Sequence, residues 1–129
     1  MREMPVPALD ILVVDDSLEN SELLAELIES YGHRVRSAQT GARALELLGE
    51  RLARLVFLDL SLPDMDGSEV ARQIRASWGT TCRIVALTGF SDAARREAAM
   101  QAGCDALLLK PLRIPQLEQT LRESAEVSP

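Results

Sequence analysis

Histidine and cysteine are scarce in this chain of 129 residues, which contains one histidine and two cysteines. Cys82 and Cys104 lie far apart and form no C-x-x-C pair, so the spacing typical of zinc sites and redox motifs is missing. A chain of this length buries roughly two-thirds of its unfolded surface, and therefore needs no disulfide or structural metal. We expect two reduced, semi-buried thiols. The single histidine, His33, follows Gly32 ahead of a short strand, where we expect a solvated turn residue.

The chain also lacks an excess of positive charge and a long apolar segment. The net charge is −6 and the isoelectric point is about 4.8. Proteins that bind nucleic acid concentrate positive charge on one face, so no direct nucleic-acid partner is expected. No apolar stretch approaches the ~20 residues that cross a bilayer, and residues 1–7 are too polar and too rich in proline for a secretory signal. We expect a cytoplasmic protein that does not insert into a membrane.

Short apolar runs that end in polar residues are the main positive feature of the sequence. Four such runs lie at residues 11–14, 55–58, 84–87 and 106–109. They end in three carboxylates, one hydroxyl and one ammonium, from Asp15, Asp16, Asp59, Thr88 and Lys110. In an open parallel sheet, ligands bind outside the carboxyl ends of the strands. The chemistry of this chain is therefore expected at those five groups.

Amphipathic helices are predicted between the runs, because apolar residues recur three and four positions apart. A fifth strand at residues 34–38 alternates polar and apolar residues, which is typical of an edge strand, whereas continuous apolar runs indicate strands covered on both faces. Strict alternation with right-handed crossovers predicts an α/β fold with a doubly wound five-stranded parallel sheet in the order 2-1-3-4-5. We expect one domain at residues 9–126, between loose tails at residues 1–8 and 127–129.

The predicted order makes the first and third strands neighbours, so Asp15, Asp16 and Asp59 meet at one edge. Three carboxylates at this range repel one another by about 4 kcal/mol per pair at an effective dielectric of about 20. Hard oxygen ligands that leave room for water and substrate favour Mg²⁺. Lys110 and Thr88 add a positive charge and a hydroxyl, which suit a phosphoryl group. Asp59 is the best candidate nucleophile, since it stands alone on the central strand.

Four motifs carry a resemblance to a known family. They are VVDDS at residues 13–17, DLSLPDMDG at residues 59–67, ALTG at residues 86–89 and LKP at residues 109–111. Together they resemble the CheY-like receiver domain of two-component response regulators, which has a flavodoxin-like (βα)5 fold. The resemblance implies a phosphorelay receiver on which Asp59 accepts a phosphoryl group from a histidine kinase or histidine phosphotransfer protein. It implies a signalling protein that catalyses only its own phosphorylation and dephosphorylation, and that switches the binding of a downstream protein.

The resemblance also implies roles for the remaining site residues. Asp16 would bind Mg²⁺ directly, Asp15 would act mainly through water, and the backbone carbonyl of Ser61 would complete the protein ligands beside Asp59. Lys110 would pair with the phosphoryl group, and a cis peptide would join it to Pro111. Thr88 would move towards the phosphate and report its presence.

Two features depart from the family pattern. The switch position on the last strand, usually tyrosine or phenylalanine, is Leu107, which argues against an aromatic rotamer switch coupled to Thr88. Ser61 stands two residues after the acceptor, where methionine or asparagine is common, and Phe90 stands two residues after Thr88. Both positions would flank the acyl phosphate and influence its hydrolysis.

Two other functions remain open. A phosphatase of the haloacid dehalogenase type also uses an aspartate nucleophile and Mg²⁺, but it normally has a second acid where this chain has Ser61. A receiver-like interaction module would keep the fold and bind its partner without phosphorylation; Leu107 is compatible with this alternative.

Several other residues receive a structural interpretation. Asp64, Asp66 and Gly67 are explained by a turn and a helix start, and we assign them no chemistry. Trp78 has core spacing, which favours packing over binding. For residues 95–96, two arginines on an alanine-rich helix, a solvated face and a contact with a partner are both open.

Overall fold

Five parallel strands form the central sheet of the computed structural model, which describes residues 8–89 and 93–126. The strands are β1 (Asp10–Val14), β2 (Arg34–Ala38), β3 (Leu55–Asp59), β4 (Arg83–Thr88) and β5 (Ala106–Leu109). The helices are α1 (Leu18–Ser30), α2 (Gly41–Glu50), α3 (Gly67–Trp78), α4 (Ala93–Ala102) and α5 (Ile114–Glu126). Each strand is followed by a helix, as the alternating sequence pattern predicts.

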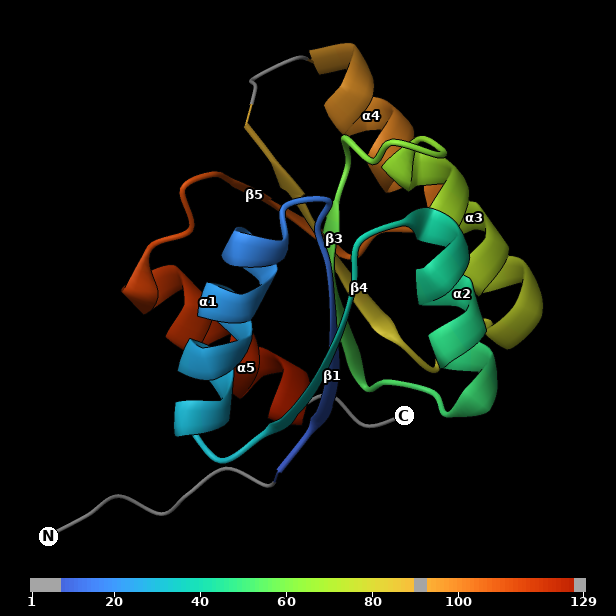
Figure 1. Cartoon of the computed structure of the whole chain (residues 1–129). Coiled ribbons are helices and arrows are strands. Elements are labelled where there is room, and N and C mark those ends of the chain that lie inside the picture. Colours follow the sequence, from blue (N-terminus) through green and yellow to red (C-terminus); the bar gives the residue numbers. More distant parts are fainter. Residues whose placement is uncertain (1–7, 90–92, 127–129) are drawn as a thin grey trace, which may run out of the picture.

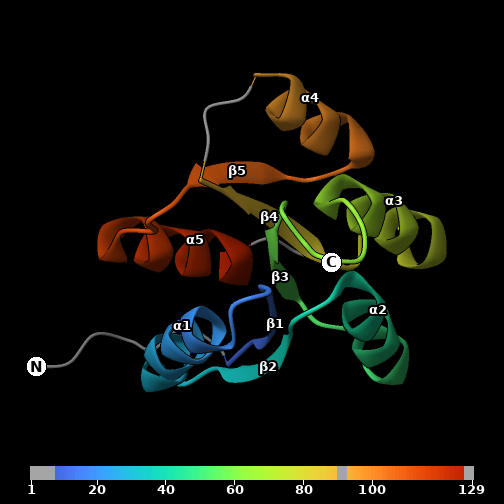
Figure 2. The ribbon, with the colours of Figure 1, turned by 45° about the horizontal axis from the view of Figure 1, so that its top comes forward.

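The sheet has the order β2-β1-β3-β4-β5, with every neighbouring pair parallel. The predicted fold class and strand order are therefore confirmed. Helices α1 and α5 cover one face of the sheet, and α2, α3 and α4 cover the other (Figures 1 and 2). In the part of the chain that is described, no helix is both long enough and apolar enough to cross a membrane.

Each face of the sheet has its own hydrophobic core, because successive strand side chains point to opposite faces. Ile11 and Val13 of β1 join the core beneath α1 and α5, whereas Leu12 and Val14 join the core beneath α2, α3 and α4. The strands β3 and β4 divide their side chains in the same way. The continuous apolar runs at residues 11–14, 55–58 and 84–87 are thus buried on both faces, as expected.

Polar residues placed just before the helices fix where three of the helices begin. Ser17 caps α1 by accepting a hydrogen bond from the Asn20 N–H at 3.2 Å, and Thr40 caps α2 in the same way. Asp66 caps α3, which agrees with the helix start expected there. At the other end of α1, Gly32 adopts a φ of 98°, a backbone conformation that favours glycine. Serine and aspartate at residues 91–92 are residue types that favour an N-cap for α4, but these two positions lie outside the described residues.

The fourth apolar run does not behave as its composition indicates. Every residue of β5 is half-buried or exposed, and Leu109 is 47% exposed. β5 is the second edge of the sheet, with β4 on one side only. Its continuous apolar character reflects contacts with both cores by Ala106, Leu107 and Leu108, and it does not indicate burial on both faces.

The expectation of a solvated histidine is wrong. His33 is only 5% exposed, and its Nδ1 accepts a hydrogen bond from the Leu9 N–H at 3.0 Å. The turn at Gly32 brings His33 back against the chain that enters β1, so the imidazole packs at the amino ends of two neighbouring strands. Burial lowers the pKa of His33, so the ring is held in its neutral form.

The two thiols follow the sequence expectation of reduced cysteines. Cys82 and Cys104 are free and buried, Cys82 more fully than expected. Burial raises the pKa of both thiols, that of Cys104 to about 11. Trp78 is half-buried and packs against the core beneath α2, α3 and α4, as its spacing predicts.

Candidate functional site

The alternation of the strands brings three charged side chains to the same side of the sheet edge. Phe57 of β3 and Val13 of β1 lie in the core beneath α1 and α5. Asp59 lies two residues after Phe57, and Asp15 lies two residues after Val13. Lys110 has the same relation to Leu108. Side chains two residues apart share a face, so the residues from β1, β3 and the end of β5 converge, although they are far apart in sequence.

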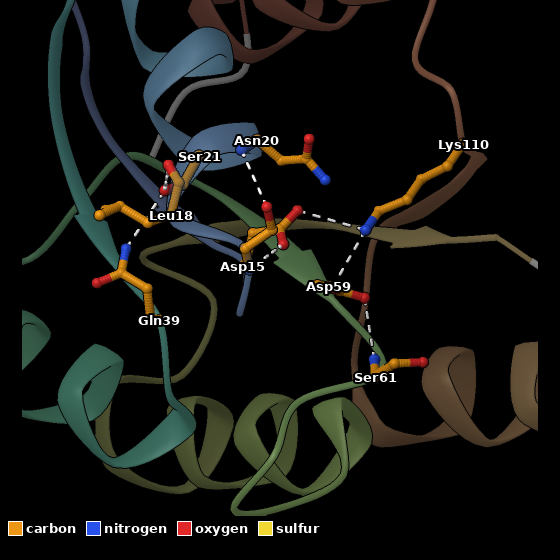
Figure 3. A network of polar contacts seen from close by, with 9 residues as sticks. Asp15, Leu18, Asn20, Ser21, Gln39, Asp59, Ser61 and Lys110 are labelled. Carbon is orange, nitrogen blue, oxygen red and sulfur yellow. Dashed lines mark hydrogen bonds and ion pairs between the residues drawn. The ribbon is translucent and has the colours of Figure 1, made fainter.

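The three acids predicted as metal ligands form one cluster. One carboxylate oxygen from each of Asp15, Asp16 and Asp59 lies within 4.8 Å of the others. Asp15 and Asp59 are buried, with exposures of 6% and 4%, whereas Asp16 is exposed. Figure 3 shows Asp15 and Asp59 facing the end of the Lys110 side chain.

Lys110 bridges the two buried acids. Its Nζ donates to Asp59 Oδ2 at 3.1 Å and to Asp15 Oδ2 at 3.3 Å (Figure 3). Partial burial of the ammonium lowers its pKa, but the charges and hydrogen bonds of Asp59 and Asp15 outweigh this effect, and the pKa is raised. Lys110 therefore stays positively charged and partly neutralises the acid cluster.

The two buried acids are also held by backbone N–H groups. Asp15 Oδ1 accepts from the Ser17 N–H at 2.9 Å, and Asp59 Oδ1 accepts from the Ser61 N–H at 3.0 Å. Among the described residues, no hydrogen bond engages the Asp16 carboxylate. Asp16 is therefore the acid with the most freedom to bind an ion directly, which suits the role that the resemblance implies for it.

The donor set at this edge fits Mg²⁺. The cluster offers carboxylate oxygens from Asp15, Asp16 and Asp59, and hard oxygen ligands are those that Mg²⁺ prefers. Because Asp16 is exposed, the arrangement leaves one side open to water and to a further oxygen ligand. Three carboxylates against the single ammonium of Lys110 also leave an excess of negative charge that a divalent cation would balance.

Thr88 lies at the same edge but on the other face of the sheet. It is 2% exposed at the end of β4, and its carbonyl accepts the Lys110 N–H at 2.7 Å. Leu107 pairs with Ala86 and lies half-buried against the core beneath α2, α3 and α4. The peptide bond between Lys110 and Pro111 is cis. Phe90, expected to flank the site, lies outside the described residues.

Close packing fixes the loop that follows Asp59. The Leu60 N–H donates to Leu87 O, and the Gly67 N–H donates to Leu60 O, both at 3.1 Å. A Cβ at position 67 would lie 2.6 Å from Leu60 Cα and 2.8 Å from the carbonyl oxygen of Asp59. Glycine is therefore required at position 67 by the approach of α3 to the end of β3, a role that the sequence did not reveal.

Arg95 lies beside the site, a position that the sequence analysis did not assign to it. Its Nη1 donates to Ser61 Oγ at 2.8 Å, so α4 contacts the loop directly beside Asp59. Arg95 is half-buried and its neighbour Arg96 is exposed. Arg95 thus makes a contact within the chain, and the choice between a solvated face and a partner contact for residues 95–96 stays open. Arg95 and Asp16 line a common hollow of about 470 Å³ with Ser61 and the rest of the loop.

Asp64 also contributes more than a turn. Its two carboxylate oxygens accept the N–H groups of Gly41 and Ala42, each at 2.9 Å, at the first turn of α2. These hydrogen bonds lower the pKa of Asp64. The loop after β3 is therefore joined to α2 as well as to α4.

Comparison with known proteins identifies relatives over nearly the whole described chain. The family model described as the response regulator receiver domain matches residues 11–122. The sensor histidine kinase RcsC of Salmonella typhi is 35% identical over 116 residues, which are 90% of this chain and 12% of the kinase. The transcriptional regulatory protein ZraR of Klebsiella oxytoca is 33% identical over 116 residues and is covered to 26%. The chain thus spans a minor part of these relatives.

A solved structure supports the same assignment. The BeF3-activated N-terminal receiver domain of RstA from Klebsiella pneumoniae superposes with a TM-score of 0.83 at 27% identity. The match covers 92% of this chain and 99% of that domain. The likeness therefore extends over a complete receiver domain, and the resemblance noted from the sequence motifs is confirmed.

Proposed function

Since this chain belongs to the response regulator receiver family, which comprises signalling domains and not classical enzymes, we propose that Asp59 accepts a phosphoryl group in a two-component phosphorelay. The observation that carries the proposal is the joint position of Asp59, Lys110 and the two acids that follow β1, Asp15 and Asp16, at one sheet edge. The donor is a phosphohistidine on a histidine kinase or histidine phosphotransfer protein, and the phosphorylated state binds a downstream protein.

The transfer exchanges one phosphorus bond for another. An oxygen of the Asp59 carboxylate forms a bond to phosphorus while the bond from phosphorus to the histidine nitrogen breaks, and the electron pair of that bond stays on the imidazole. Asp59 is held for attack by Ser61 N–H and Lys110, each on a different oxygen. Such positioning is the main requirement of phosphoryl transfer, together with neutralisation of the oxygens on phosphorus.

Residues already in place supply that neutralisation. Lys110 lies 3.1 Å from Asp59 Oδ2 and would donate to a phosphoryl oxygen. Thr88 supplies a hydroxyl at the end of the neighbouring strand and would bind another oxygen. The ligands for Mg²⁺ would be Asp16, Asp59, the carbonyl of Ser61 and, through water, Asp15. The cation would balance the acids and the incoming phosphoryl group.

The acceptor is tested by Asp59→Asn, with Asp64→Asn as the matched control in the same loop. Acetyl phosphate or a phosphorylated kinase should label the wild type and Asp64→Asn, with one phosphate per chain, but not Asp59→Asn. Labelling of Asp59→Asn at the wild-type level would place the acceptor elsewhere.

The metal ligand is tested by Asp16→Ala. Titration calorimetry should show Mg²⁺ binding to the wild type and little or none to Asp16→Ala, because the exposed acid would be lost while the Lys110 bridge remains. Identical titration curves would contradict the assignment of Asp16.

The phosphatase alternative predicts a different stoichiometry. Repeated release of phosphate from an added phosphate ester would favour that function, whereas one phosphate retained per chain favours the receiver. A partner that binds wild type and Asp59→Asn equally in the presence of a phosphoryl donor would favour the phosphorylation-independent module.

A further inference from the structure

We propose that Arg95 is a phosphate-binding residue that joins α4 to the phosphorylated acceptor loop. The inference rests on the proposed function of Asp59 and adds a residue to that site. It also assigns α4 a direct response to the phosphoryl group, a response that depends on no aromatic residue at position 107.

Arg95 is connected to Asp59 through Ser61. Ser61 donates its backbone N–H to Asp59 and accepts a hydrogen bond from Arg95 on its hydroxyl. One residue therefore separates the guanidinium from the acceptor carboxylate. Arg95 and Ser61 line one hollow together with Asp16, so a phosphoryl group on Asp59 that reached this hollow would meet the guanidinium.

The guanidinium group of Arg95 is suited to binding a phosphoryl group. Arginine has five N–H donors in a planar fork and prefers phosphate and carboxylate oxygens. Arg95 can therefore donate to a phosphoryl oxygen while it keeps its hydrogen bond to Ser61. A hydroxyl such as that of Ser61 is a weak partner for a guanidinium, so a phosphoryl group would be the stronger acceptor.

Phosphorylation would add negative charge to the site. With a divalent cation bound, Lys110 and the cation together balance Asp15, Asp16 and Asp59. Phosphorylation replaces the single charge of Asp59 by about two negative charges, so the site gains an excess negative charge. Among the described residues that line this hollow, Arg95 is the cation, beside the acids Asp16, Asp64 and Asp66, and its guanidinium can offset part of the added charge.

Helix α4 packs against the rest of the molecule through small buried side chains. Its buried residues are Ala99 and Ala102, so no large side chain anchors α4 in the core. A hollow of about 740 Å³ lies beside α4, lined by Arg96, Met100 and Leu107 among others. A helix with small anchors and space beside it shifts at low cost, so a new bond from Arg95 to the phosphate would reposition α4. Figure 2 shows α4 at the periphery of its layer.

The experiment compares Arg95→Met and Arg95→Lys with Arg96→Met, which removes the neighbouring exposed charge. Beryllofluoride with Mg²⁺ serves as the probe, because it forms a tetrahedral group on a carboxylate that resembles phosphoryl. Its affinity should fall by about ten-fold in Arg95→Met, as expected for one charge-assisted hydrogen bond, and less in Arg95→Lys. Arg96→Met should match the wild type.

A second measurement separates phosphate binding from a structural role. The affinity for Mg²⁺ alone should be the same in Arg95→Met and Arg96→Met. Beryllofluoride should shift the backbone amide resonances of α4 in the wild type and in Arg96→Met. In Arg95→Met the shifts should persist near Asp59 and shrink in α4.

The outcomes distinguish the inference from the proposed function. Wild type that binds the probe, with Arg95→Met equal to Arg96→Met in affinity and in the α4 shifts, would overturn the inference alone. Wild type that takes up neither phosphate nor beryllofluoride would overturn the proposed function and the inference with it.

Discussion

The glycine at position 67 gives a test of how rigidly the acceptor strand is held. In Gly67→Ala the new methyl would lie 2.6 Å from Leu60 Cα and 2.8 Å from the carbonyl oxygen of Asp59. Carbon atoms in contact are normally about 3.5 Å apart, so the loop and α3 must separate by about 1 Å. The atoms that would have to move belong to the backbone, which cannot relieve the contact by changing a rotamer.

This separation should lower both the free energy of unfolding and the rate of phosphorylation. Overpacking of this kind costs about 1–3 kcal/mol, and replacing glycine returns about 0.4–1 kcal/mol through the unfolded state. We therefore expect a net loss of about 1–2 kcal/mol in the free energy of unfolding. A displacement of about 1 Å at reacting atoms lowers rates by up to about 100-fold, so phosphorylation by acetyl phosphate should slow by about 10- to 100-fold.

The matched control is Gly49→Ala. Position 49 lies in α2, is exposed, and has no atom within 4 Å of an added Cβ. This substitution should raise the free energy of unfolding by about 0.5–1 kcal/mol and leave the phosphorylation rate unchanged. Urea unfolding followed by circular dichroism measures stability, and a phosphate-affinity gel measures the rate of labelling.

Gly67→Ala with wild-type stability and a wild-type rate of labelling would refute the reasoning. Such a result would mean that the loop after β3 accommodates the methyl by moving away from α3 without cost. Loss of stability with an unchanged rate would show instead that Asp59 keeps its position while α3 alone adjusts.

Three further predictions concern residues outside the acceptor pocket. Burial lowers the pKa of His33, so the folded state resists protonation. The free energy of unfolding should be full above about pH 6.5, the ordinary pKa of histidine, and should fall as the pH drops below it. His33→Asn should weaken this pH dependence in urea unfolding, and an equal slope would contradict it. Asp64→Ala should lower the unfolding temperature more than Asp64→Asn, which keeps one acceptor oxygen for the α2 N-terminus. With its pKa near 11, Cys104 should resist alkylation at pH 8 until urea unfolds the chain, and rapid reaction of the native protein would disprove its burial.

The sequence predicts the fold and the acid cluster because both depend on short-range patterns. Residues 11–14 and 55–58 are apolar runs that end in acids. The alternation of strands and helices, together with the edge pattern of residues 34–38, favours the order 2-1-3-4-5. Once β1 and β3 are neighbours, Asp15 and Asp59 must lie at the same edge. The same rule brings Lys110 to them from the edge strand.

The residues that the sequence did not reveal depend on distant contacts. Arg95 looks like any charged residue on an alanine-rich helix, and its partner Ser61 is 34 residues away. Asp64 resembles an ordinary turn residue, but it binds the start of α2. His33 follows a turn glycine, yet the chain entering β1 covers it. No local pattern carries this information, because each contact is set by how the elements pack.

The buried sheet divides the molecule into two helical layers that share few side chains. Asp15, Asp59 and Lys110 lie in line with the core beneath α1 and α5, whereas Thr88 and Leu107 lie in line with the core on the α4 side. Substitutions in one layer should therefore have effects on stability that add to those in the other. Non-additive effects should concentrate at the carboxyl ends of the strands, where both layers meet, so natural variation in the two helical surfaces can proceed independently.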